Sequence, residues 1–95
     1  MLYVIHAYYH TDADALDRRM AARADHFNYV RQLKATGQFL LGGALLDPEG
    51  KMIGSMLILN METEDQLTTY LHTDPYSVKG VWDKIDIKPF RQADV

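Results

Sequence analysis

The chain has 95 residues, which is enough for one domain with a single core and too few for two. Hydrophobic residues make up 47% and charged residues 24%, so disorder and collagen-like repeats are excluded. Cysteine is absent, which excludes disulfides, thiol nucleophiles and zinc–thiolate sites and fits a reducing compartment. We therefore expect a single domain over residues 1–95.

The charge balance narrows the possible partners. Ten Lys and Arg against 13 Asp and Glu give a net charge of −3, without the basic footprint of nucleic-acid binders. The longest stretch without charged or strongly polar residues, Phe39 to Leu46, is far shorter than the roughly 20 residues that span a bilayer. The amino terminus has no basic region of a signal peptide. These features predict a cytoplasmic protein that binds neither nucleic acid nor membrane.

The first predicted element is a strand over Leu2–Tyr9, which is rich in Tyr, Val and Ile and too short for a stable helix. Both faces of this strand are apolar except at His6. Such a pattern is typical of a strand in the middle of a sheet that is covered on both sides.

A long helical region follows the first strand. Asp12 or Asp14 can accept free N–H groups at its start, and Gly37 ends it after about Thr36. Residues 22–24 allow either one helix or a short helix followed by a longer one. Apolar spacing predicts an inward stripe, with arginines at its flanks, formed by Ala22, His26, Tyr29, Val30 and Leu33.

Two further strands, Gln38–Leu46 and Met52–Met61, flank the sequence Asp47-Pro-Glu-Gly50. Asp at the first position, Pro at the second and Gly at the fourth favour a type I turn. The pattern therefore predicts a β-hairpin.

The second helix starts at a predicted capping box, in which Thr63 and Gln66 satisfy each other's free N–H groups. It is expected to end near Asp74, because Pro75 disfavours α geometry in the residue before it. A last strand is indicated by the alternation of apolar and charged residues through Ile85, Ile87 and Phe90.

The element order β-α-β-β-α-β predicts an α+β fold of the ferredoxin-like type, with a four-stranded antiparallel sheet. The two helices can cover one face of that sheet, and nothing else in the chain covers the other. An apolar face of this size exceeds the few hundred Å² that a monomer usually exposes. We therefore expect a homodimer that forms through the open sheet face.

His26 and Asp74 are the candidates for proton transfer. His26 lies in the apolar stripe, where a buried imidazole needs polar partners. Asp74 is expected at the carboxyl end of a helix, where the helix dipole disfavours a negative charge that no partner holds. The two helices lie side by side in this topology, so a contact is sterically possible. The alternatives are a core histidine with satisfied hydrogen bonds and an ordinary Asp-Pro turn.

Other polar and small residues give weaker signals. Gly42-Gly43 lacks the spacing of a phosphate-binding loop and favours a close backbone approach or a bulge. Ser55 fits an outward strand position as well as a site, and Tyr76 and Trp82 can line a pocket or close the sheet edge. No compact set of histidines and carboxylates emerges, so we expect no metal site.

The order of these motifs resembles the YciI (YCII-related) family over nearly the whole chain. The motifs that carry the resemblance are Met1-Leu-Tyr-Val-Ile, Arg19-x3-Arg23-x2-His26, Gly42-Gly43, Gly54-Ser55, Asp74-Pro-Tyr-x3-Gly80-Val81 and Lys88-Pro-Phe90. Ala44 departs from the family pattern, which more often has proline there, and this departure bears on the shape of the pocket wall.

The resemblance implies a ferredoxin-like domain that dimerises as a dimeric α/β barrel, with an active site centred on His26 and Asp74. Ser55 corresponds to the serine of the family's Gly-Ser pair. One relative of the group eliminates HCl from a chlorinated hydroxyquinol, and structural cousins include muconolactone isomerases.

Together these observations predict a cofactor-independent acid–base enzyme of the lyase or isomerase type, acting on a small cyclic or aromatic molecule. Asp74 would fix the tautomer of His26, and His26 would move the proton. The alternative is a non-catalytic, dimeric module that binds a small ligand or docks a partner. A haem-handling or oxygenase relative has only fold analogy behind it. The predicted substrate-binding residues, beside the catalytic His26, Asp74 and Ser55, are Arg23, Gly43, Tyr76 and Trp82.

Overall fold

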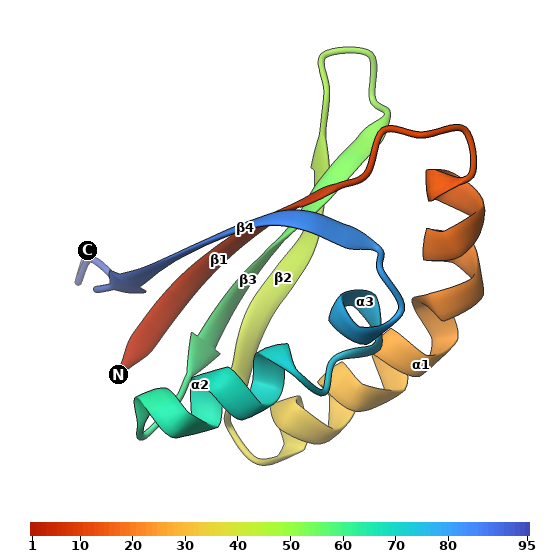
Figure 1. Cartoon of the computed structure of the whole chain (residues 1–95). Helices are drawn as coiled ribbons and strands as arrows, with labels where there is room; N and C mark the ends of the chain where they lie inside the picture. The colour runs from red at the N-terminus through yellow and green to blue at the C-terminus, as the bar shows by residue number, and fades with distance from the viewer.

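The computed structural model describes all 95 residues as one four-stranded sheet with its helices on one face (Figure 1). The strand order is β2-β3-β1-β4, and every neighbouring pair is antiparallel. This confirms the predicted ferredoxin-like order. The elements are β1 (Leu2–Tyr9), α1 (Ala15–Ala35), β2 (Phe39–Leu46), β3 (Met52–Asn60), α2 (Glu64–Leu71), α3 (Pro75–Val78) and β4 (Trp82–Phe90). None of the helices is both long enough and apolar enough to cross a membrane.

The core lies between the sheet and the helices. Tyr3, Ile5 and Ala7 of β1 are at most 7% exposed. They pair in register with Leu59, Leu57 and Ser55 of β3. Since successive side chains of a strand point to opposite faces, the alternate residues of β1 and β3 turn away from the helices.

The other face of the sheet, here called the open face, has no helix over it (Figure 1). His6 lies at its centre, paired with Met56 and Asp86. The apolar side chains that the register assigns to this face include Leu2, Val4, Tyr8, Leu41, Leu45, Met56, Ile58 and Phe90. β4 adds the charged residues Lys84, Asp86 and Lys88 to this face. The open face is therefore largely apolar along β1, β2 and β3, as the alternation in β1 predicts, and charged along β4.

α1 is one continuous helix of 21 residues, without a break at residues 22–24. Asp14 is its N-cap residue but makes no side-chain capping bond. Instead, the Asp12 carboxylate accepts the backbone N–H of Asp14 at 3.3 Å. Gly37 has a φ of +80°, which a residue with a side chain rarely adopts, and this confirms it as the stop.

The turn of the β2–β3 hairpin forms as predicted, with the Gly50 N–H donating to the Asp47 carbonyl at 3.0 Å. The capping box is only half present. The Gln66 N–H donates to the Thr63 hydroxyl at 3.1 Å, but the Gln66 side chain accepts from the N–H of Glu62 instead of Thr63.

The region around Asp74 corrects the sequence prediction. α2 ends at Leu71, and a separate short helix, α3, begins at Pro75. Asp74 is the N-cap of α3, and its side chain accepts the N–H of Tyr76 at 2.9 Å. The carboxylate therefore lies at the amino end of a helix. The expected conflict with the dipole at the carboxyl end of the second helix does not arise.

Candidate active site

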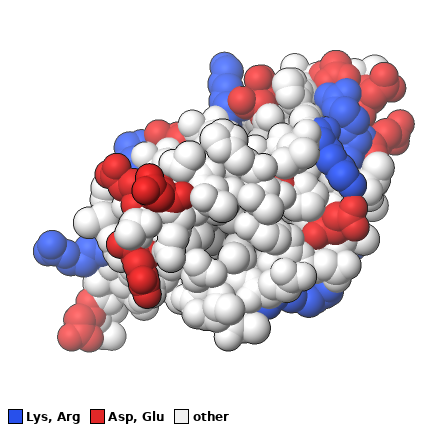
Figure 2. All heavy atoms as spheres, turned by 60° about the horizontal axis from the view of Figure 1, so that its bottom comes forward, with Lys and Arg blue, Asp and Glu red and all other residues white.

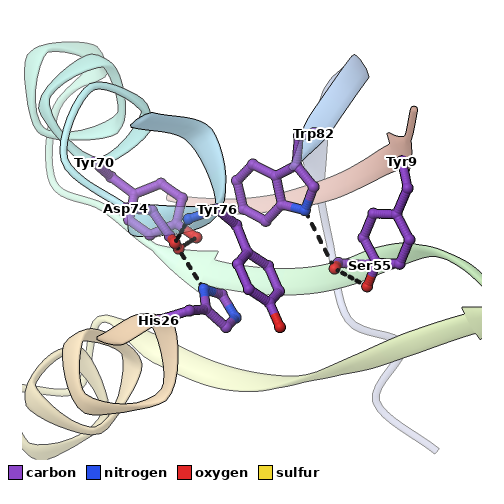
Figure 3. A network of polar contacts seen from close by, with 7 residues as sticks. All are labelled: Tyr9, His26, Ser55, Tyr70, Asp74, Tyr76 and Trp82. Carbon is purple, nitrogen blue, oxygen red and sulfur yellow. Dashed lines mark hydrogen bonds and ion pairs between the residues drawn. The ribbon is translucent and has the colours of Figure 1, made fainter. Parts of the chain in front are cut away.

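His26 of α1 and Asp74 meet beneath α3, although 48 positions separate them in the chain. His26 Nδ1 lies 2.6 Å from Asp74 Oδ1 (Figure 3). The Asp74 side chain is fully buried and that of His26 is 8% exposed. The contact that the topology allowed is thus present as a short, buried hydrogen bond.

The hydrogen-bond partners of Asp74 fix the tautomer of His26. Asp74 Oδ1 also accepts the Tyr76 N–H, and Oδ2 accepts the Tyr70 hydroxyl at 2.5 Å. Burial raises the pKa of the Tyr70 hydroxyl, and the neighbouring carboxylate raises it further, so this hydroxyl remains a donor. A carboxylate can only accept, so Nδ1 of His26 carries a hydrogen and donates it. In the neutral ring, Nε2 is then the nitrogen with a free lone pair.

Aromatic rings hold the imidazole of His26 in its plane. The Tyr76 ring stacks on it at 3.7 Å between centroids and within 3° of parallel. The Trp82 ring meets it edge-on at 6.1 Å and 79° (Figure 3). These contacts, with the bond to Asp74, leave His26 little freedom to rotate.

A second polar chain lies on the other side of Tyr76. The Trp82 indole N–H donates to Ser55 Oγ at 3.2 Å, and Ser55 Oγ is 3.1 Å from the Tyr9 hydroxyl (Figure 3). The Tyr9 hydroxyl in turn accepts Arg19 Nε at 3.0 Å. Ser55 is therefore a buried member of a hydrogen-bonded chain, which differs from the outward strand position that the sequence also allowed.

A cavity of about 140 Å³ opens between α1, α3 and the β2–β3 hairpin. Both polar groups reach it, since His26 and Ser55 are part of its wall. Its lining is mostly apolar, and consists of Tyr9, Arg19, His26, Phe27, Val30, Phe39, Gly42, Gly43, Ala44, Ser55, Met56, Leu57 and Tyr76. The face of the molecule seen in Figure 2 is uncharged over its middle, with charged side chains gathered toward its edges.

The glycine pair of β2 forms part of the cavity wall. A Cβ on Gly42 would lie 2.7 Å from the Met56 carbonyl oxygen, so glycine allows the two strands to approach closely there. A Cβ on Gly43 would meet nothing within 4 Å. Ala44, the position at which the family pattern more often has proline, also lines the cavity.

The structure brings two of the four sequence-predicted binding residues to the cavity. Gly43 and Tyr76 line it. Trp82 does not, because it is buried behind Tyr76 and holds Ser55 instead. Arg23 is exposed and outside the cavity, with its guanidinium 4.3 Å from the centre of the Phe27 ring.

The sequence analysis missed Arg19, which it placed on the flank of the helix. Arg19 is only 6% exposed and lines the cavity. It precedes Ala22 by three positions and His26 by seven, so helical periodicity puts it on the same face as the buried stripe. Extending that stripe by one turn toward the amino end would have found it.

The structure does not gather three or more histidine, aspartate or glutamate side chains in the way that a metal ion requires.

Comparisons with known proteins identify the family of the chain. Residues 1–91 match the model of the YCII-related domain. The chain belongs to the YCII-related family. It is 31% identical over 99 residues to protein YciI of Escherichia coli O6:H1, and the match covers 98% of this chain and 99% of that protein. An uncharacterized protein of Haemophilus influenzae is equally similar over the same shares.

A solved structure extends the likeness of this YCII-related chain to the fold. It is that of the 5-chloro-2-hydroxyhydroquinone dehydrochlorinase TftG from Burkholderia phenoliruptrix AC1100, in complex with 2,5-dihydroxybenzoquinone. The TM-score is 0.82 at 23% identity, with 98% of this chain and 96% of that one covered. This likeness confirms the ferredoxin-like fold.

Proposed function

We propose that this YCII-related chain is a cofactor-independent enzyme that moves a proton on a small ring compound, with His26 as the proton carrier. The observation that carries the proposal is the buried bond between His26 Nδ1 and Asp74, which leaves Nε2 on the side of the ring away from the carboxylate (Figure 3). His26 lines the cavity, so its free nitrogen is within reach of a bound molecule.

Asp74 supports this role by stabilising the charge that His26 would gain. When Nε2 accepts a proton, the ring becomes a cation whose Nδ1–H already points at the carboxylate. Because Asp74 is fully buried, that attraction is only weakly screened by water. General acid–base assistance of this kind is worth about 10²–10⁴-fold in rate.

The proton has two possible fates, and they define the reaction type. In an isomerase, Nε2 returns it to another atom of the same molecule. In a lyase, a leaving group departs with its bonding electrons, and the proton is later released to solvent, so that one acid molecule is lost overall. Both routes use His26, which lines the cavity and is held by Asp74.

The size of the cavity favours a single ring. A volume of about 140 Å³ is close to the roughly 150 Å³ of an engineered cavity that holds benzene. The structurally similar TftG is named for dehydrochlorination of a single-ring hydroquinone. Hydroxylated or halogenated single-ring compounds are therefore the substrates that we propose to test first.

The direct test is to incubate the protein with 5-chloro-2-hydroxyhydroquinone and to measure chloride release. We expect release that His26→Gln reduces by at least about 100-fold. The matched control is His72→Gln, since His72 is exposed at the end of α2. Deuterium exchange of ring hydrogens with solvent detects proton transfer if chloride is not the leaving group. Binding without either signal would favour a non-catalytic ligand-binding module.

We also propose that a second copy of the chain covers the open face, giving a dimeric α/β barrel. The support is the row of apolar side chains on β1 and β3 that no helix shields. Covering such a row removes apolar surface from water at about 25 cal/mol per Å². A two-fold axis brings the same surface of both copies together, so one apolar face on each chain is enough to form the interface.

Light scattering after size-exclusion chromatography tests the dimer. We expect twice the 10.9 kDa mass of the chain, and expect Val4→Asp on the open face to give monomers. Leu16→Asp is the control, because Leu16 is 54% exposed on α1. A wild-type monomer at micromolar concentration would contradict the proposal.

A further inference from the structure

Several polar side chains at the cavity can donate hydrogen bonds to a bound molecule: Tyr9, Arg19, Ser55 and Tyr76. Arg19 is buried against the cavity, and none of the five ion pairs of the structure includes it. Its hydrogen bonds go to the neutral Tyr9 hydroxyl and, at 3.5 Å, to the sulfur of Met20. A guanidinium has five N–H donors, so most of them have no strong acceptor. The one buried carboxylate, Asp74, already accepts bonds from three other donors, and none of them is Arg19.

The Tyr9 and Ser55 hydroxyls beside Arg19 have one hydrogen between them that no protein acceptor uses. Arg19 Nε donates to the Tyr9 hydroxyl, and the Trp82 N–H donates to Ser55. The bond between Tyr9 and Ser55 uses the hydrogen of one of the two hydroxyls. Whichever of them donates, the other hydroxyl keeps a hydrogen with no partner within the protein. Both residues line the cavity, so this hydrogen is available to a bound molecule.

Tyr76 adds another donor without a partner. Its hydroxyl is the one buried side-chain oxygen or nitrogen atom that lacks a hydrogen bond. The residue is 1% exposed and lines the cavity, with the hydroxyl at the end of the ring farthest from its backbone (Figure 3). Burial raises the pKa of Tyr76, so the hydroxyl keeps its hydrogen. An unpaired buried hydroxyl is costly unless a ligand supplies the acceptor.

We infer that the cavity binds a ring compound through an anionic oxygen, and that Arg19, with Tyr76 and the Tyr9–Ser55 pair, forms the subsite for that oxygen. A surplus of donors around an uncompensated cation favours a ligand that brings negative charge and acceptors. A carboxylate, phenolate or enolate oxygen has this chemistry.

The position of Arg19 links this subsite to His26, and this step rests on the proposed function. The Arg19 guanidinium carbon is 5.9 Å from the centre of the Tyr76 ring, on which the His26 ring also stacks at 3.7 Å. An oxygen held by Arg19 therefore lies beside the residue that also supports His26. Charge that develops on this oxygen as His26 removes a proton would be stabilised by the same donors.

The test compares the binding of charged and neutral rings by titration calorimetry. The probes are benzoate, 2,5-dihydroxybenzoquinone in its anionic form, and the neutral benzamide. We expect the wild type to bind an anion more tightly than benzamide, and Arg19→Met to weaken anion binding about 10–100-fold with little change for benzamide. If the quinone binds more tightly than benzoate, the subsite prefers an oxyanion on the ring. If benzoate binds more tightly, the subsite prefers a carboxylate.

Arg23→Met is the matched control, since Arg23 lies four residues away on the same helix and outside the cavity. We expect its affinities to stay within twofold of the wild type. The inference would be overturned if the wild type bound benzamide as tightly as both anions, or if anion binding were lost in Arg23→Met but not in Arg19→Met.

Tyr76→Phe provides a second variant in case Arg19→Met does not fold. It removes an unpaired hydroxyl, so we expect an unchanged or higher melting temperature together with weaker anion binding. Unchanged anion binding in Tyr76→Phe, with Arg19→Met unfolded, would also overturn the inference. Binding needs no turnover, so anion binding through Arg19 without proton transfer would refute only the proposed function. Proton transfer by the wild type, with anion binding unchanged in Arg19→Met, would refute only the subsite.

Discussion

The replacement Asp74→Asn tests the buried network at its centre. Asparagine offers one oxygen and one NH₂ group in place of two acceptor oxygens. If its oxygen keeps the bonds from His26 and the Tyr76 N–H, its NH₂ faces the Tyr70 hydroxyl, which loses its acceptor. If the amide turns the other way, its NH₂ faces His26 Nδ1 and forces the ring into the opposite tautomer.

The expected loss of stability follows from the broken contact. A hydrogen bond to a charged group contributes about 1.5–3 kcal/mol. The neutral amide also avoids the cost of burying a charge, so we expect the lower end, about 1.5 kcal/mol. For a chain of this size, that lowers the melting temperature by about 6–12 °C.

Thermal melts followed by circular dichroism, with urea unfolding alongside, measure this change. The matched control is Asp25→Asn, because Asp25 forms an exposed ion pair with Lys79 at 2.7 Å. Exposed pairs contribute about 0–1 kcal/mol, so the control should remain close to the wild type. If Asp74→Asn unfolds at the wild-type temperature, the carboxylate does not hold the network as described.

Three further predictions concern other parts of the structure. Burial raises the pKa of Tyr70 above its ordinary value of about 10, so the neutral hydroxyl stabilises the fold fully below pH 10. This stabilisation is lost as the pH rises further. Between pH 9 and pH 11, the free energy of unfolding in urea should fall less in Tyr70→Phe than in the wild type. The Arg18 guanidinium lowers the pKa of Asp12 to about 2, so this pair stabilises the fold above pH 3.8 and loses its effect as the pH falls through 2. An NMR titration of Arg18→Gln should return the midpoint toward 3.8. Gly54→Ala should cost about 1–3 kcal/mol in urea unfolding, because its Cβ would lie 2.5 Å from a carbonyl oxygen of β1, whereas Gly43→Ala meets no atom.

The elements of the fold could be predicted because each has a local cause. β1 is marked by its β-branched and aromatic residues, and the hairpin by the turn sequence that starts at Asp47. The strand order then follows from the β-α-β-β-α-β arrangement. α3 escaped prediction, because a four-residue helix carries no periodic pattern and Pro75 indicates only that the preceding helix has ended.

The dyad could be proposed only as a contact that the topology allows. Its geometry depends on α3, which turns Asp74 from a helix end into an N-cap facing His26. The bond from the Tyr70 hydroxyl to Asp74 has no signal in the sequence beyond the spacing of four positions. The cytoplasmic location and the single-domain extent of residues 1–95 stay predictions from composition and length.

Arg19 shows that residue type was a misleading guide to burial. Arg19 and Arg23 look equivalent in the sequence, and charged side chains are usually exposed. Their angular positions on α1 differ. Arg19 is buried with its guanidinium over the Tyr76 ring of α3, whereas Arg23 is exposed over the Phe27 ring. The periodicity of the helix was therefore a better guide than the charge.

The position of the hydrogen on the His26 ring tests the account most directly. Nitrogen-15 NMR of protein with labelled histidine distinguishes a neutral ring protonated at Nδ1 from one protonated at Nε2. The network around Asp74 predicts hydrogen on Nδ1 and a bare Nε2 facing the cavity. A neutral ring with its hydrogen on Nε2 would leave no base at the cavity and would contradict the proposed proton transfer.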